Sequence, residues 1–196
     1  MSAEKRVYLL RHGETWDNVN GIHQGWSPSA LTQKGVEQAY AAGVLLRDAG
    51  IERIFCSDLV RAKETAEEVR KQVSAPIVYA SWLRELGKGV FEGLPSGTLK
   101  RHIRSNNLDS YTYAPKGGES LQGFEERVIS GFNECIACAP NVSLFITHGG
   151  VIAALRYYVE GKRVGKLFAY APNNGEIMVL ENRESLRIRP FAPHNL

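Results

Sequence analysis

The stretch Val7–Thr15 reads VYLLRHGET. Its first four residues are apolar, and such a short apolar run is typical of a strand buried in a sheet. Arg11, His12 and Gly13 follow this run directly. In open α/β sheets, ligands bind at the carboxyl ends of parallel strands. An apolar strand that ends in Arg-His-Gly therefore predicts an α/β fold with a ligand site at this end of the strand.

The remainder of the chain repeats this kind of strand. Four further short apolar runs are Ile54–Cys56, Ile77–Tyr79, Leu144–Thr147 and Ile177–Leu180. Between them lie windows with apolar residues at helical spacing, such as 36–46 and 121–135. Strands that alternate with helices predict an α/β sandwich with a mostly parallel sheet.

Helix start signals add detail to this pattern. Ser120 is the expected N-cap of the helix at 121–135, because its hydroxyl can accept from a free backbone amide of the first turn. Ser57 or Asp58 is the expected cap of another helix, which runs to about Gln72.

Length and composition are those of one globular domain, 1–196. Of the 196 residues, 43% are hydrophobic and 23% are charged. No apolar run approaches the ~20 residues that span a bilayer, so we expect a cytoplasmic protein with no membrane contact. The net charge of +3 comes without a run of five like charges, so a nucleic-acid partner is not expected. The oligomeric state stays open, a homodimer included.

The three cysteines are too few for a disulfide framework. Cys135 and Cys138 form a C-x-x-C pair inside a helical pattern, with neither a preceding strand nor a second ligand pair. We expect them to be core or surface thiols rather than a redox or zinc motif.

The stretch from Gly87 to Gly118 interrupts the alternation of strands and helices. It contains several glycines, Pro95, Pro115 and the basic run 100–104. We interpret it as an insertion at about 87–118 that is partly helical and covers a site as a lid. The alternative is a plain surface excursion whose charges are solvated.

The informative polar residues come just after the strands. His12 follows the first strand, Ser57 and Arg61 the second, Glu85 the third and His148 the fourth. Because the carboxyl ends of parallel strands share one edge of a sheet, we expect these side chains to converge.

Such a cluster suits the transfer of a phosphoryl group. Arg11 and Arg61 would clamp the phosphate oxygens, and a neutral His12 would attack phosphorus. Glu85 would protonate the leaving oxygen and then deprotonate the attacking water, while His148 would hydrogen-bond the transferred oxygens. Glycines beside both histidines, such as Gly149, let the backbone approach the phosphate.

Zinc is a rival ligand for His12, Glu85 and His148. However, two adjacent arginines oppose the binding of a cation, so we expect no metal and no other cofactor.

The sequence resembles the histidine phosphatase superfamily, which includes the cofactor-dependent phosphoglycerate mutases. The motifs that carry the resemblance are Leu10–Thr15 with Asn18, Gln24–Gly25, Leu31–Thr32, Gly35 with Gln38–Ala39, Ser57–Leu59 with Arg61–Ala62, Thr65–Ala66, Leu83–Glu85, Phe91–Gly93, Gly117–Ser120 and Thr147–Gly150. Arg-His-Gly alone would be a weak signal, but the ordered series spans roughly residues 6 to 181.

The resemblance implies a fold and a set of roles. The fold is a three-layer α/β/α sandwich with a mostly parallel mixed sheet, phosphoglycerate mutase-like, and no metal is used. His12 resembles the phosphorylated nucleophile and Glu85 the proton donor. The phosphate pocket would be completed by Arg11, Arg61 and His148, with substrate-side contacts from Asn18, Gln24, Gly25 and Gly149.

The resemblance also implies a function of the small phosphatase branch: hydrolysis of a small phosphorylated metabolite. The resemblance implies that the mutases of the family are longer chains, in which a larger insertion closes the site against water. The insertion between Glu85 and Glu119 of this chain is modest. A cofactor-dependent phosphoglycerate mutase is the alternative. A non-catalytic module that binds phosphorylated ligands is a second alternative, although such a module would be expected to lose His12 or Glu85.

Overall fold

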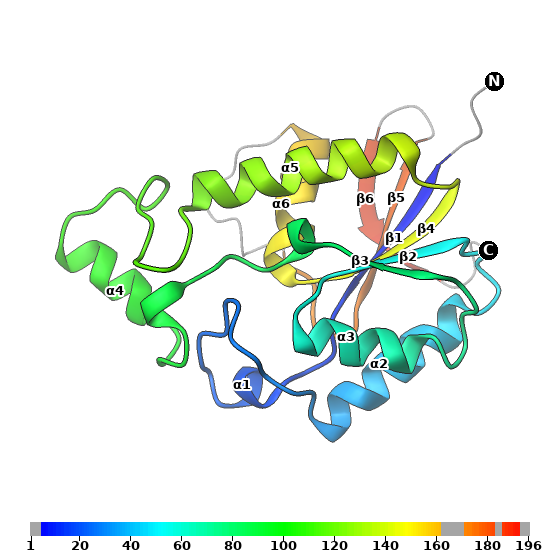
Figure 1. The fold of residues 1–196 in the computed structure, drawn as a ribbon, viewed down its shortest axis with the longest axis horizontal. Coiled ribbons are helices and arrows are strands. Elements are labelled where there is room, and N and C mark those ends of the chain that lie inside the picture. The colour runs from blue at the N-terminus through cyan, green and yellow to red at the C-terminus, as the bar shows by residue number, and fades with distance from the viewer. Residues whose placement is uncertain (1–4, 162–170, 183–185, 193–196) are drawn as a thin grey trace.

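A computed structural model describes residues 5–161, 171–182 and 186–192. Its six strands are β1 (Arg6–Arg11), β2 (Arg53–Cys56), β3 (Ile77–Tyr79), β4 (Val142–Thr147), β5 (Ile177–Asn182) and β6 (Leu186–Pro190). They form one sheet in the order β3-β2-β4-β1-β5-β6 (Figure 1). The first four strands of this order are parallel to one another. Strand β5 pairs antiparallel with β1 on one side and with β6 on the other. The expected mostly parallel mixed sheet is confirmed.

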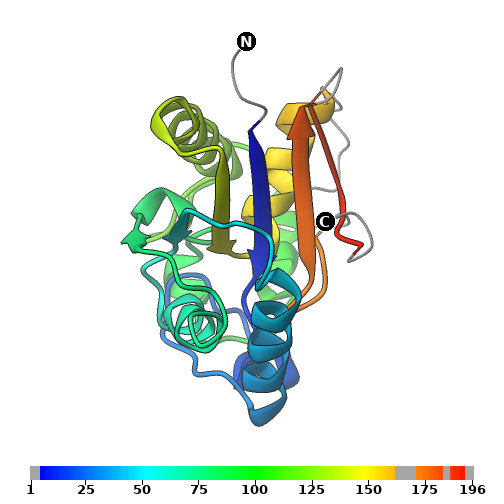
Figure 2. The same cartoon turned by 90° about the vertical axis from the view of Figure 1, so that its right-hand side faces the viewer.

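Helices cover both faces of the sheet. The helices are α1 (Trp16–Val19), α2 (Gln33–Leu46), α3 (Val60–Val69), α4 (Thr98–Ser105), α5 (Leu121–Cys138) and α6 (Gly149–Glu160), with two 3-10 turns, η1 (Ser81–Leu83) and η2 (Gly89–Phe91). Helices α2 and α3 lie on one face, and α5 and α6 on the other (Figures 1 and 2). This arrangement confirms the three-layer α/β/α sandwich.

Strand β1 separates two apolar cores because its side chains alternate between the faces. Val7 and Leu9 pack into the core beneath α5 and α6. Tyr8 and Leu10 pack into the core beneath α2 and α3. A strand that is apolar on both faces is the signature of a central strand, which explains the unbroken run at the start of VYLLRHGET.

The register of the parallel strands brings their carboxyl ends together. Arg11 pairs with Thr147, and Cys56 pairs with Ile146. The next residues along the chain, His12, Ser57 and His148, therefore meet at one edge of the sheet.

The segment 87–118 projects beyond this edge and carries η2 and α4 (Figure 1). An isolated bridge joins Pro95 of this segment to Ile22, and a second bridge, between Lys88 and Gly118, joins the two ends of the segment to each other. No residue of α4 is fully buried. Its action as a lid stays a prediction.

Two local expectations need comment. Ser120 caps α5, since its hydroxyl accepts from the amide of Gly123 at 3.1 Å, as expected. The expected cap of α3 by Ser57 or Asp58 is wrong: the N-cap is Leu59, which makes no side-chain cap bond, and the helix ends at Val69. The two polar side chains are used elsewhere, Ser57 on His148 and Asp58 on Arg84.

Strand β6 was not anticipated from the sequence. Cys135 and Cys138 lie near the end of α5 as free thiols.

Within the described residues, no helix combines the length and apolar character needed to cross a membrane.

The packing of α5 on η1 leads to a testable expectation for stability. A Cβ on Gly131 would lie 2.3 Å from Cγ of Trp82. We expect Gly131→Ala to lower the free energy of unfolding by about 1–2 kcal/mol, because overpacking outweighs the gain in helix propensity. Gly123→Ala in the same helix is the matched control, since its Cβ would meet Ser120 Oγ at an ordinary 3.4 Å. Urea unfolding measures both, and equal stability of the two variants would contradict the packing argument.

Candidate active site

The backbone of His12 is fixed from two directions. Its N–H donates to Thr147 O of β4 at 2.9 Å. Its carbonyl accepts from Nδ2 of Asn174 at 3.1 Å. The next residue is pressed against α2, because a Cβ on Gly13 would lie 2.2 Å from Gly35 O. Only glycine tolerates this approach, which places the imidazole rigidly at the strand end.

The imidazole of His12 is buried and has a defined tautomer. Nδ1 is 2.7 Å from the carbonyl oxygen of Gly13, which can only accept, so Nδ1 carries the hydrogen. Burial lowers the pKa of His12 well below its usual value, and Arg61 and Arg11 lower it further. The ring is therefore neutral at pH 7, and Nε2 keeps a lone pair for a reaction.

Two arginines bring positive charge to His12. Arg11 donates through Nη1 to Pro172 O at 2.6 Å. Arg61, which is 1% exposed, donates through Nη2 to Gly25 O at 2.8 Å. Burial lowers the pKa of Arg61 to about 10, so it stays protonated at neutral pH. The Nε atoms of both arginines are buried, and no described residue accepts from them.

His148 lies beside His12, with ring centroids 5.1 Å apart. Its Nε2 is 2.8 Å from Ser57 Oγ, and its buried Nδ1 has no partner among the described residues. Burial lowers the pKa of His148 well below its usual value, with Arg61 as the largest charge contribution. His148 is also the N-cap of α6, so the partial positive charge of a helix N-terminus adds to the same place.

Glu85, which follows the third strand and the turn η1, completes the cluster. Its carboxylate accepts from Leu86 N at 2.8 Å and from Gly150 N at 3.0 Å. Other acidic residues of the region are engaged elsewhere. Glu14 binds Lys34 and Thr32, and Glu119 binds Arg127. Glu85 is thus a carboxylate that attracts both Arg11 and Arg61 and is bound by Gly150, two residues after His148.

The expected substrate-side residues lie around this cluster. Asn18 accepts through Oδ1 from Thr15 and from Asn174, and Gln24 donates through Nε2 to Thr15 Oγ1. Oε1 of Gln24 is buried and has no partner in the described part of the chain. Gly149 lies against the guanidinium of Arg11, to which a Cβ would come within 3.5 Å.

The polar groups of Gly25 and Asn18 are bound within the protein. The carbonyl of Gly25 accepts from Arg61, and the amide oxygen of Asn18 accepts from the amide of Thr15, the N-cap of α1. These two residues shape the loop that holds the arginine and the turn after β1.

Two residues of the site were assigned no role from the sequence: Asn174, which no motif included, and Thr65, which appeared only within a motif. Asn174 precedes β5 and binds the carbonyls of both His12 and Gly13. Thr65 of α3 accepts from Gly13 N at 3.1 Å. The Asn174-Gly175 pair is a turn signal, but no local pattern indicates that it reaches residue 12.

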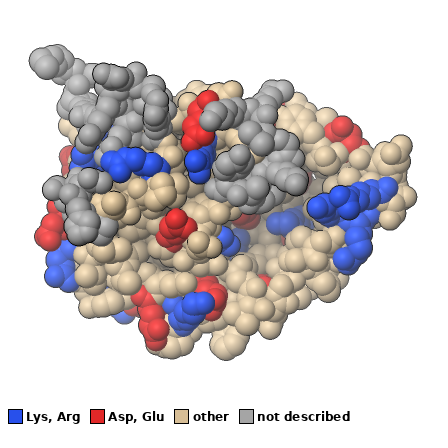
Figure 3. All heavy atoms as spheres, turned by 180° about the vertical axis from the view of Figure 1, so that it is seen from behind, with Lys and Arg blue, Asp and Glu red and all other residues tan. Residues whose placement is uncertain are grey.

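The geometry suits a tetrahedral anion. The buried Nε–H groups of Arg11 and Arg61 and the buried Nδ1 of His148 have no partner within the described chain, while Nε2 of the neutral His12 keeps its lone pair. Buried donors that lack partners imply a ligand that supplies them. Figure 3 shows a hollow on this side of the molecule with Lys and Arg side chains in it and beside it. Among the described residues, no group of three His, Cys, Asp or Glu side chains is arranged to hold a metal ion.

Comparison with protein families agrees with this geometry. The family model described as "Histidine phosphatase superfamily (branch 1)" matches residues 7–187. The "Probable phosphoglycerate mutase GpmB" of Erwinia tasmaniensis is 35% identical over 155 residues, covering 76% of this chain and 72% of that protein. The "Adenosylcobalamin/alpha-ribazole phosphatase" of Salmonella typhimurium is 33% identical over 166 residues, covering 76% of this chain and 77% of that protein.

Solved structures share the fold over nearly the whole chain. The α-ribazole phosphatase of Shigella flexneri superposes with a TM-score of 0.80 at 27% identity, covering 95% of each chain. The mycobacterial glucosyl-3-phosphoglycerate phosphatase, solved in complex with VO3, gives a TM-score of 0.80 at 28% identity and covers 96% of this chain and 98% of that chain.

The two buried histidines make stability depend on pH. Both have pKa values lowered on folding, so below about pH 6.5 the unfolded chain binds protons that the folded chain does not. Their contribution to stability is complete above that pH. It is lost as the pH falls, by up to about 1.4 kcal/mol per pH unit for each histidine. We expect His12→Asn and His148→Asn each to reduce the slope of unfolding free energy between pH 6.5 and 5.5, measured by urea unfolding without phosphate. Equal slopes in wild type and both variants would contradict this assignment.

Proposed function

The chain belongs to the histidine phosphatase superfamily, and on this premise we propose that it hydrolyses small phosphorylated metabolites through a phosphohistidine intermediate on His12. It is an enzyme, a phosphoric monoester hydrolase, with phosphatases among its relatives. The observation that carries the mechanism is the hydrogen bond from His12 Nδ1 to Gly13 O, which leaves Nε2 as the nucleophile.

In the first step, Nε2 of His12 attacks phosphorus and the bond to the leaving oxygen breaks. Negative charge on the three transferred oxygens is met by Arg11, Arg61 and His148, whose positions are set before substrate arrives. Because burial and these arginines hold His12 neutral, none of its reactivity is lost to protonation.

Glu85 handles the proton in both steps. In its acid form it donates a proton to the leaving oxygen, so the product departs as an alcohol. The resulting carboxylate, held by the amides of Leu86 and Gly150, then takes a proton from the water that attacks phosphohistidine. Release of inorganic phosphate restores neutral His12 and protonated Glu85, so the cycle balances.

This mechanism has no role for a metal ion. The charge that a Lewis acid would neutralise is assigned to Arg11 and Arg61. The substrates named for the relatives, α-ribazole phosphate and glucosyl-3-phosphoglycerate, have different alcohol parts. The phosphate pocket therefore supports a substrate class, and a screen of phosphorylated metabolites for phosphate release identifies the member.

A phosphoglycerate mutase is the second candidate, favoured by the similarity to the protein named GpmB. A mutase returns phosphate from the histidine to a bound intermediate instead of to water. Incubation with 3-phosphoglycerate and 2,3-bisphosphoglycerate separates the two, since a mutase forms 2-phosphoglycerate and a phosphatase releases inorganic phosphate. A binding module without catalysis would do neither.

The nucleophile is tested by trapping the intermediate. With a radiolabelled phosphomonoester and a metal chelator, we expect acid-labile label on the wild type and none on His12→Ala. Turnover of the variant should fall by more than the ~10²–10⁴-fold typical of losing an acid or base. Label retained on His12→Ala would overturn the assignment of His12, and a wild-type rate that needs an added divalent cation would overturn the metal-free mechanism.

The proton donor is tested by varying the leaving group. Glu85→Gln keeps the shape of the side chain but cannot transfer a proton. We expect kcat/KM to fall by about 10²–10⁴-fold for an alkyl phosphate and far less for p-nitrophenyl phosphate, whose leaving oxygen needs little protonation. Equal losses on both substrates would show that Glu85 only shapes the pocket.

A further inference from the structure

The segment that carries Glu85 has little secondary structure of its own. After the short turn η1 (Ser81–Leu83), residues 84–88 belong to neither a helix nor a strand. Their backbone groups must find partners outside a regular ladder. The position of the Glu85 carboxylate therefore depends on what holds this backbone.

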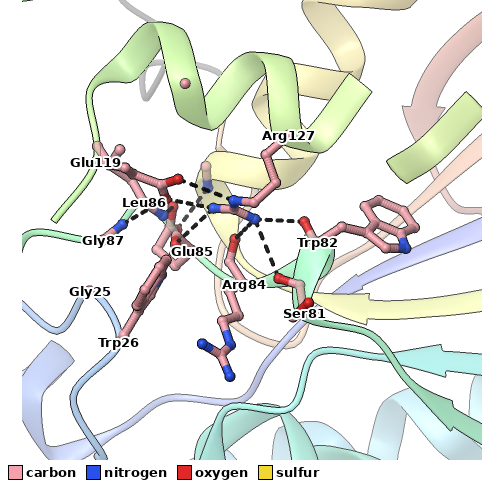
Figure 4. A network of polar contacts seen from close by, with 12 residues as sticks. Gly25, Trp26, Ser81, Trp82, Arg84, Glu85, Leu86, Gly87, Glu119 and Arg127 are labelled. Carbon is pink, nitrogen blue, oxygen red and sulfur yellow. Dashed lines mark hydrogen bonds and ion pairs between the residues drawn. The ribbon is translucent and has the colours of Figure 1, made fainter. Parts of the chain in front are cut away.

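One side chain, Arg127, donates hydrogen bonds to several backbone carbonyls of this segment and of η1. Arg127 reaches across from α5 and donates through Nη1 to Trp82 O at 2.7 Å and to Arg84 O at 3.1 Å (Figure 4). Longer contacts run from Nη1 to Ser81 O at 3.5 Å and from Nη2 to Glu85 O at 3.4 Å. A planar guanidinium has the number and direction of donors for this task, which an ammonium group lacks.

Glu119 orients Arg127 and extends the contact past Glu85. Its carboxylate accepts from Nη2 and Nε of Arg127 at 2.6 and 3.1 Å. The same carboxylate accepts from Gly87 N at 3.0 Å, and the amide of Glu119 donates to Gly87 O at 3.1 Å. Residues on both sides of Glu85 are thus held by one Arg–Glu pair.

A second donor meets the Glu85 carbonyl from the opposite loop. The indole Nε1 of Trp26 donates to Glu85 O at 2.7 Å (Figure 4). The neighbouring residue Gly25 accepts from Arg61, so this loop links the phosphate-binding arginine to the backbone of the proton donor.

We propose that Arg127 is a positioning residue for proton transfer by Glu85, because it fixes the backbone from Ser81 to Gly87 against α5. The inference rests on the proposed role of Glu85 as the acid and base. Arg127 makes no hydrogen bond to the phosphate-binding side chains or to the nucleophile in the contacts described, and its charge is the smallest of the influences on the pKa of His148. We therefore expect its main effect to pass through Glu85. The core beneath α5 is formed by other residues, Phe124, Val128 and Phe132 among them.

The expected effect is selective for the leaving group. A misplacement of about 1 Å in a catalytic group can cost about 10²-fold in rate. For Arg127→Met we therefore expect kcat/KM to fall by about 10- to 10²-fold on an alkyl phosphate and by less than about threefold on p-nitrophenyl phosphate. Competitive inhibition by inorganic phosphate should change by less than about twofold, because Arg11, Arg61 and His148 keep their positions.

Three variants complete the experiment. Arg127→Met added to Glu85→Gln should cause little further loss, since residues that act through one group are not additive. Arg127→Lys keeps the positive charge but lacks the planar set of donors of a guanidinium. If Arg127→Met does not fold, the two substrates are compared on Arg127→Lys instead. Arg156→Met removes a similarly half-buried arginine that is paired with Glu160 on α6, and it should leave both substrates unaffected.

The outcomes separate the two levels of the proposal. Equal losses on both substrates, weakened phosphate inhibition, or full additivity with Glu85→Gln would overturn the role of Arg127 while leaving that of Glu85 intact. If Glu85→Gln itself shows no leaving-group selectivity, the proposed function of Glu85 fails, and the inference about Arg127 fails with it.

Discussion

The guanidinium of Arg61 is buried at the carboxyl edge of the sheet, and most features of the site follow from this buried charge. Within the described chain it forms no ion pair with a carboxylate, and backbone carbonyls of Gly25 and Ser27 take part of its hydrogen-bonding capacity. The carboxylates of Glu85, Glu92 and Asp17 attract it without forming an ion pair, and burial of such a cation is still costly, as its lowered pKa shows. Burial is the main cause that lowers the pKa of His12 and of His148, and the charge of Arg61 lowers both further, since another positive charge there would be repelled. An anion bound here would balance this charge, which agrees with the proposed binding of a phosphate.

The loop from Gln24 to Ser27 directs backbone carbonyls at the buried guanidinium of Arg61. Gly25 adopts a positive φ of 53°, which turns its carbonyl toward Arg61 while a Cβ would collide with Glu92. Trp26 next to it binds the carbonyl of Glu85. The arginine proposed to hold the phosphate and the glutamate proposed to move the proton are thereby both bound by one short piece of backbone, Gly25 and Trp26.

The sequence allowed the sheet, its parallel part and the convergence of His12, Arg61, Glu85 and His148 to be predicted, because strand ends and their polar followers are local patterns. It did not reveal the roles of Asn174 or Arg127, which depend on contacts across many residues of chain. The cap of α3 was predicted wrongly, because Ser57 has the right residue type for a cap but its hydroxyl is hydrogen-bonded to Nε2 of His148. Strand β6 lacks the unbroken apolar run by which the other strands were predicted, since Leu186–Pro190 alternates apolar and charged residues, a pattern that also indicates a strand.

The antiparallel direction of β5 has a consequence for the order in which the site forms. In a parallel strand the last residue faces the site, but in β5 the residue that enters the strand does. Asn174, 162 positions after His12, thus closes around the backbone of a residue from the first strand. Such a contact closes one of the longest loops in the chain and is slow to form. We therefore expect the hydrogen bond that holds the carbonyl of His12 to form late in folding, once β5 has paired with β1.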